Sequence, residues 1–159
     1  MNVHLRNGLR TGIIFGIVLI FLVLIGFPTT VSDLLGGILK DEASKPVFGL
    51  TPAMLNMLIF FGLVGLWAGA SGARPVKAGG KFFSLAGGVI SGALAGFLLS
   101  LLIYTIGSLD AAGVKMNTYL DQLLPDAVHL FTLKMSPVNA GVVYFILFII
   151  VGALGAPPF

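Results

Sequence analysis

The chain has 159 residues, of which 57% are hydrophobic and 9% are charged. A water-soluble domain of this length needs far more charge to cover its surface, so a soluble globular protein is excluded. The net charge of +3 could suggest nucleic acid, but the basic and acidic residues fall in separate connecting segments, which argues against such a partner. The chain has no cysteine, so disulfides, thiolate metal sites and cysteine catalysis are excluded.

Four segments without Lys, Arg, Asp, Glu or His are each long enough to cross a bilayer as a helix, which takes about 20 residues. They are residues 11–32, 46–73, 82–109 and 135–159. Hydrocarbon offers no partner for unpaired backbone groups, so these segments are predicted to be helical. We expect a single all-α integral membrane domain over residues 1–159. Its four-helix bundle has spans at about residues 9–27, 52–70, 82–107 and 137–156.

The first predicted span follows Arg6 and Arg10, which resemble the basic start of a signal peptide. The apolar run is long, however, and residues 26–30 offer no small-x-small cleavage site. We therefore expect this segment to be retained as a membrane anchor. The connection that follows is expected to hold a short interfacial helix starting at Ser32 and Asp33.

The second and fourth spans share a start signal. Thr51 precedes Pro52, and Ser136 precedes Pro137. A hydroxyl side chain can accept a hydrogen bond from the first turn, and proline at the first helical position lacks an N–H that has no helical partner there. These two pairs are therefore predicted to begin the second and fourth helices.

The third span carries small residues at strict four-residue intervals, which give one helix face without bulk. In lipid there is little hydrophobic drive between helices, so close approach through such a face holds them together. The favoured interpretation is packing within the bundle of this chain, and the alternative is docking of a partner subunit. The predicted face consists of Ser84, Gly88, Gly92, Gly96 and Ser100, with shorter versions at Gly12, Gly16, Gly65 and Gly69.

The last connection predicts a second interfacial helix over residues 117–133, where apolar and polar side chains alternate at roughly helical spacing. Such a helix lies at the outer surface with its apolar face toward lipid or toward the bundle. The favoured interpretation is a filler between spans. A binding cap over the spans is the alternative.

The two predicted helical hairpins resemble one another. The segment GIIFG at residues 12–16 has a counterpart, GVISG, at residues 88–92, and a Phe-Leu pair follows each at the same offset. Two helices return the chain to the same side, so such repeats are parallel and related by an axis along the membrane normal. Chance similarity between small apolar alphabets is the alternative, and the two are weighed equally.

Charge predicts the orientation of the chain. Basic residues without acidic neighbours precede the first span and occupy the connection at residues 71–81, whereas all six acidic residues lie in the other two connections. By the positive-inside rule, both termini are expected in the cytoplasm and the protein in the cell (inner or plasma) membrane, with lipid as its first partner.

Polar side chains at membrane depth are few, and the candidates for polar contacts are Asn56, Asn139 and Tyr144. Bonds between helices are the favoured role for all three. Proton relays and voltage sensors need ionisable groups inside the membrane, and the spans carry no carboxylate, lysine, arginine or histidine. No catalytic or nucleotide-binding motif is found, so we expect neither an enzyme nor a cofactor.

Several apolar segments resemble the extra N-terminal membrane segment of some permeases of branched-chain amino-acid ABC transporters. The stretches that carry the resemblance are residues 9–12, 21–26, 85–99, 124–131 and 151–156. The permease core that would follow such a segment is absent, since the sequence ends at Phe159. The resemblance implies a membrane-embedded accessory piece beside a translocation path, and it carries over no residue that contacts substrate.

The preferred functional prediction is a non-catalytic subunit or domain that packs and scaffolds within a larger membrane assembly, a transport permease being the first choice. The third span serves as the docking face and the helix near residues 117–133 as a cap. One alternative is a structural subunit of a respiratory or photosynthetic complex. Another is a small pore built by self-association.

Overall fold

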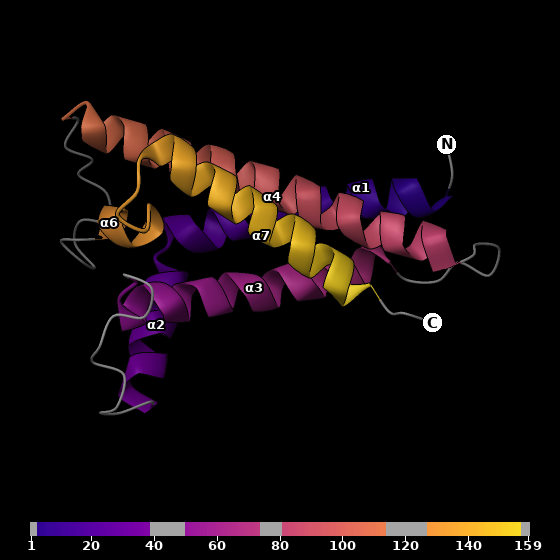
Figure 1. The fold of residues 1–159 in the computed structure, drawn as a ribbon, viewed down its shortest axis with the longest axis horizontal. Helices are drawn as coiled ribbons and strands as arrows, with labels where there is room; N and C mark the ends of the chain where they lie inside the picture. The colour runs from indigo at the N-terminus through magenta and orange to yellow at the C-terminus, as the bar shows by residue number, and fades with distance from the viewer. Residues whose placement is uncertain (1–2, 39–49, 74–80, 114–126, 157–159) are drawn as a thin grey trace.

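The computed structural model describes residues 3–38, 50–73, 81–113 and 127–156. In this part, four helices are long and apolar enough to cross a membrane. They are α1 (Val3–Leu24), α3 (Pro52–Gly72), α4 (Lys81–Ala111) and α7 (Pro137–Gly155), joined by the shorter α2 (Phe27–Ile38) and α6 (Ala127–Phe131). The predicted all-α membrane bundle of four helices is confirmed (Figure 1).

The long helices alternate in direction, so both chain termini lie at the same end of the bundle (Figure 1). We call this the terminal end and the opposite one the distal end. Both α2 and α6 lie at the distal end. At 31 residues, α4 is the longest helix, and its length of about 46 Å exceeds the roughly 30 Å of bilayer hydrocarbon.

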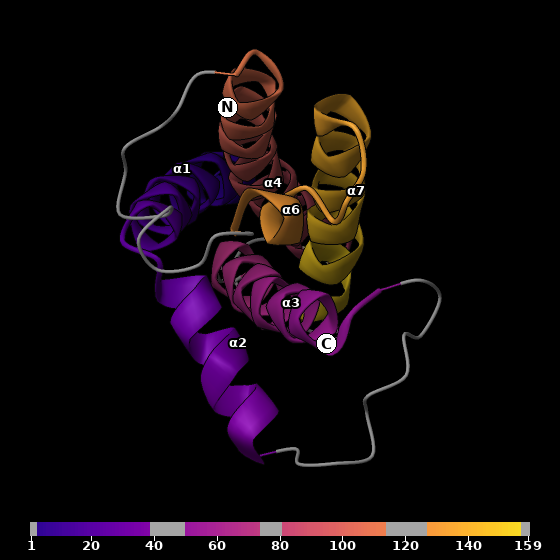
Figure 2. The same cartoon turned by 90° about the vertical axis from the view of Figure 1, so that its left-hand side faces the viewer.

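Helix α4 is the central element, because it packs against α1, α3 and α7. Figure 2 shows α1 and α7 on opposite sides of α4, with α3 below them. The two hairpins pack differently: α4 and α7 share an extensive contact surface, whereas α1 and α3 share a smaller one. The parallel repeat stays a prediction, to be tested by superposing residues 11–70 on residues 85–156.

The predicted starts of the second and fourth spans are confirmed. The Thr51 side chain accepts a hydrogen bond from the backbone N–H of Met54 at 3.4 Å, and Pro52 opens α3. Ser136 accepts from the N–H of Asn139 at 3.4 Å, ahead of Pro137 in α7.

The first span ends at Leu24 rather than at residue 27. Gly26 has a φ of 73°, a left-handed conformation that ends the helix and that side chains with a β-carbon adopt only at a cost. The Gly26 carbonyl oxygen then accepts bonds from the hydroxyls of Thr29, at 2.6 Å, and Thr30, at 3.1 Å. Helix α2 therefore starts at Phe27, and the predicted start at Ser32 is wrong because Ser32 lies inside α2.

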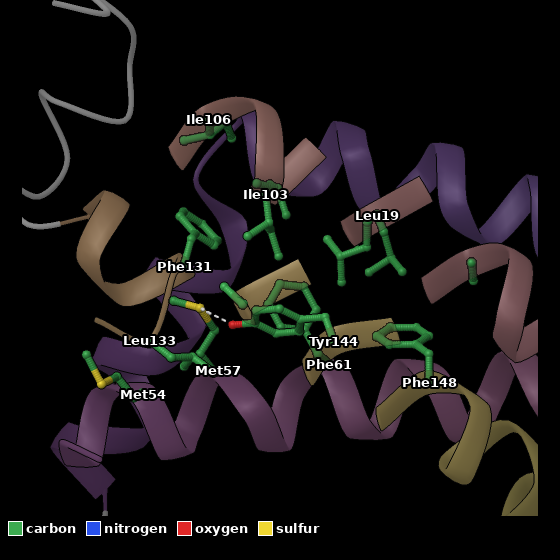
Figure 3. Close-up of a cluster of buried hydrophobic side chains, with 14 residues drawn as sticks. Leu19, Met54, Met57, Phe61, Ile103, Ile106, Phe131, Leu133, Tyr144 and Phe148 are labelled. Carbon is green, nitrogen blue, oxygen red and sulfur yellow. Dashed lines mark hydrogen bonds between the residues drawn. The ribbon is translucent and has the colours of Figure 1, made fainter. Parts of the chain in front are cut away.

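The core changes character along the bundle. Helices α3 and α4 converge at the terminal end and diverge toward the distal end (Figure 1). Glycines fill the narrow part. The wide part is filled by bulky buried side chains, shown in Figure 3: Met54, Met57, Phe61, Ile103, Ile106, Phe131, Leu133 and Tyr144.

Helix α6 lies in the wide part, between α3 and α4 (Figure 2). Phe131 is fully buried, so the apolar face of this segment is directed into the bundle. Within the predicted interfacial helix, α6 covers residues 127–131, and residues 117–126 lie outside the described residues. The corner to α7 holds Leu133 and Lys134 at φ values of 54° and 57°, a conformation that costs about 1–2 kcal/mol for each L-residue.

Replacing Gly26 with alanine tests the break between α1 and α2. A β-carbon at a φ of 73° is strained, so we expect Gly26→Ala to lower the free energy of unfolding by about 1 kcal/mol. Thermal or denaturant unfolding in detergent measures this. An unchanged unfolding midpoint would show that the corner does not depend on the left-handed conformation of Gly26.

Candidate functional site

The predicted glycine stripe on α4 faces α7. A β-carbon built on Gly88 would lie 2.8 Å from the carbonyl oxygen of Gly152. On Gly92 it would meet the carbonyl oxygen of Phe148, and on Gly96 it would meet the Phe148 side chain. The obstacles at Gly88 and Gly92 include backbone atoms, which cannot rotate away. Helices α4 and α7 therefore approach one another backbone to backbone.

Gly152 completes this contact from α7. A β-carbon on Gly152 would lie 2.9 Å from the carbonyl oxygen of Gly88 and 2.9 Å from the Cα atom of Gly92. The four-residue spacing predicts the stripe on α4 but does not identify Gly152 as its partner. The signal is a pair of glycines, Gly152 and Gly155, in the closing turns of α7. Gly155 meets the backbone of Leu66 on α3.

A second small-residue contact joins α1 to another side of α4. A β-carbon on Gly12 would lie 2.7 Å from the carbonyl oxygen of Ser91. Gly8, which is not among the residues predicted from the sequence, belongs to the same row one turn earlier. The three α1 glycines and their nearest α4 neighbours are Gly8 with Gly87, Gly12 with Ser91, and Gly16 with Leu98.

The predicted pair on α3 is also directed inward. Gly65 meets the side chain of Val151 on α7, and Gly69 meets the backbone of Gly152. Small residues of α1, α3, α4 and α7 thus form one continuous set of contacts, which we call the seam. By contrast, a β-carbon built on Gly62 of α3 would have no neighbouring atom within 4 Å among the described residues.

The seam lies within the fold of this chain. The groove on α4 that could dock a partner helix is occupied by α7 (Figures 1 and 2). A partner could enter the groove only by displacing α7 and breaking the backbone contacts around Gly92. Any partner of the folded chain therefore packs on the outward faces of the helices, which carry large apolar side chains such as Ile17, Phe21 and Leu63.

Serine hydroxyls on α4 strengthen the seam by donating hydrogen bonds to carbonyl oxygens of neighbouring helices. Such bonds contribute about 1 kcal/mol in membrane proteins. The three bonds are Ser84 Oγ to Ala73 at 2.8 Å, Ser91 Oγ to Ala68 at 2.9 Å, and Ser100 Oγ to Gly141 at 2.7 Å.

The Asn7 side chain adds a bond from α1. Its Nδ2 donates to the carbonyl oxygens of Ser71 and Gly72 at 3.3 and 3.2 Å. The last carbonyls of a helix have no partner within the helix. Side chains of α1 and α4, those of Asn7 and Ser84 included, therefore cap the C-terminal turn of α3.

The three polar candidates have different surroundings. Asn56 is buried in α3 and has an interaction partner, whereas Asn139 lies on an exposed face in the first turn of α7. Tyr144 is fully buried, and its hydroxyl donates to the thioether of Met57 across the bundle at 3.8 Å (Figure 3). Its ring packs edge-on against Phe61, with centroids 5.3 Å apart. The expectation that Tyr144 lies near a span end is wrong, because it forms part of the core.

No protein-family model, curated protein or solved structure matches this chain. The resemblance to permease segments therefore stays a prediction. Within the described residues, no group of three or more His, Cys, Asp or Glu side chains could hold a metal ion. What the geometry provides is a packing site, built from glycine backbone and serine hydroxyls.

A matched pair of glycine substitutions tests the seam. Gly92→Ala places a methyl group against the Phe148 carbonyl oxygen, so we expect it to lower the free energy of unfolding by about 1–3 kcal/mol through overpacking. Gly62→Ala makes the same chemical change where no atom of the described residues lies within 4 Å. It is expected to leave stability unchanged or raise it by up to about 1 kcal/mol, because alanine favours the helix. Equal effects in thermal unfolding would contradict the seam.

A matched pair of hydroxyl deletions tests the polar part. Ser91→Ala removes the bond to Ala68 on α3, and we expect a loss of about 1 kcal/mol of unfolding free energy. The control is Thr105→Ala, because Thr105 is exposed and bonds within its own helix to Leu101. The same unfolding assay should show no significant change for this control. A neutral Ser91→Ala would show that packing alone holds α3 to α4.

Proposed function

We propose that this protein is a non-catalytic integral membrane subunit or domain that packs inside a larger membrane assembly. The observation that carries the proposal is the content of the bundle interior. The four uncharged segments carry no Lys, Arg, Asp, Glu or His side chain, and the axis is filled by fully buried side chains such as Leu19, Leu99 and Phe148. An interior of this kind supports rigid packing and offers little for proton transfer or ion coupling.

The resemblance of the apolar segments to permease segments supports a transport permease as the assembly. In that setting the protein is an accessory piece beside a translocation path. The role predicted for the third span changes in one respect: its glycine face holds α7, so partner contacts belong to the outward helix faces. A structural subunit of a respiratory or photosynthetic complex is the alternative with the same physical requirements, and a pore requires several copies because the interior of one copy is filled.

The proposed orientation places the terminal end in the cytoplasm of a cell membrane. Arg6 and Arg10 are exposed near the start of α1 at the terminal end. Asp110 is exposed at the end of α4, at the distal end. Basic residues are enriched on the cytoplasmic side of membrane proteins, which supports this orientation.

Extraction of the tagged chain in mild detergent, followed by mass spectrometry of the intact complex, tests the proposal. We expect the chain at a fixed stoichiometry with other membrane subunits. A lipid-bound monomer alone would contradict the proposal. A symmetric homo-oligomer would favour the pore, and a coloured complex would favour the redox assembly.

Gly62→Leu supplies a matched variant for locating a partner. It adds bulk to the outward face of α3, where no atom of the described chain would lie within 4 Å of the new β-carbon. Loss of the partner with an intact monomer would place the interface on this face. Retention of the partner would exclude it. Gly92→Leu, by comparison, is expected to abolish folding, because its neighbour is the backbone of α7.

A further inference from the structure

The distal end of the bundle is closed by one short element. Helix α6 has five residues, and its Phe131 side chain lies among Met57, Ile103 and Ile106 from α3 and α4 (Figure 3). Leu133 in the following corner is also buried. These two side chains fill the space left where α3 and α4 diverge.

The backbone of α6 and its corner is a self-contained unit. The N–H of Thr132 donates to Val128, that of Leu133 to Leu130, and that of Lys134 to His129, at 2.9, 3.3 and 3.0 Å. These bonds lie inside the segment and persist if it moves as a body. Apolar burial of Phe131 and Leu133 attaches the segment to α3 and α4.

Two features oppose that burial. Leu133 and Lys134 both hold left-handed backbone conformations in the closed arrangement, which L-residues adopt at a cost. The Tyr144 hydroxyl, beneath α6, donates to a thioether at 3.8 Å, and sulfur is a weak acceptor. Opening would relieve the backbone and give the phenol access to a stronger acceptor.

We propose that α6 and residues 132–135 form a hinged plug that swings out of the distal end and exposes Met57 and Tyr144. The seam at the terminal end keeps the four long helices together while the plug moves. Opening is therefore a local event, distinct from unfolding of the bundle. The proposal does not depend on which assembly contains the protein.

The absence of cysteine from the chain makes thiol labelling a direct test. Met57→Cys places a thiol under the plug, and Leu19→Cys places one at an equally buried site on α1, away from α6 (Figure 3). A membrane-impermeant maleimide should label the Met57→Cys protein at least tenfold faster than the Leu19→Cys protein. Equal rates would mean that both thiols react only after global unfolding, and this would overturn the proposal.

A second pair of variants identifies the hinge. Lys134 is exposed, so its side chain can change without loss of core packing. Asparagine tolerates the left-handed conformation, whereas a β-branched residue does not. In the Met57→Cys background, Lys134→Val should label about tenfold faster than Lys134→Asn, a difference of about 1.4 kcal/mol in the opening equilibrium.

The Leu19→Cys background separates hinge motion from general destabilisation. There, the two substitutions at Lys134 should give the same labelling rate. If both backgrounds respond equally, the corner affects global stability rather than a plug. If neither responds, the backbone at Lys134 is not the hinge, and the proposal fails in that form.

Discussion

The close approach of α4 and α7 is the contact on which the rest of the fold depends. In water, burial of apolar surface would bring these helices together, but lipid tails are as apolar as the side chains themselves. The helices must therefore gain more from one another than from lipid. Glycine at Gly88, Gly92 and Gly152 permits this, because whole stretches of backbone come into dispersion contact. Serine hydroxyls such as that of Ser91 add hydrogen bonds to the same seam.

This close approach at one end has a consequence at the other. Long helices that meet at the terminal end and cross at an angle must diverge toward the distal end (Figure 1). The space between them is filled by large side chains, including those of Phe61 and Tyr144, and by α6 (Figure 3). The bundle thus combines a narrow end held by backbone contacts with a wide end closed by side chains. A scaffold with one rigid end and one adjustable end is the functional character that we propose.

Some of this arrangement could be predicted from residue patterns, and some could not. The four-residue spacing of small side chains in α4 predicts a close-packed face, and Thr51-Pro52 predicts a helix start, because both signals are local. The same spacing cannot say which helix fills the face. Gly8 and Gly152 belong to the seam only because the fold brings α1 and α7 beside α4. Tyr144 could equally have faced a membrane interface, and the rotation of α7 directs it into the core instead.

The sequence by itself determined the class and the membrane setting of this protein. Long uncharged segments must satisfy their backbone groups internally, so helices that cross the bilayer are the solution available to them. Only the tertiary structure decided that α4 is central, that its glycine groove belongs to α7 and that α6 closes the wide end. The reason is that lipid exerts no net preference among apolar helix faces. Pairing between helices therefore depends on how surfaces fit in three dimensions, and a linear pattern of apolar residues does not encode that fit.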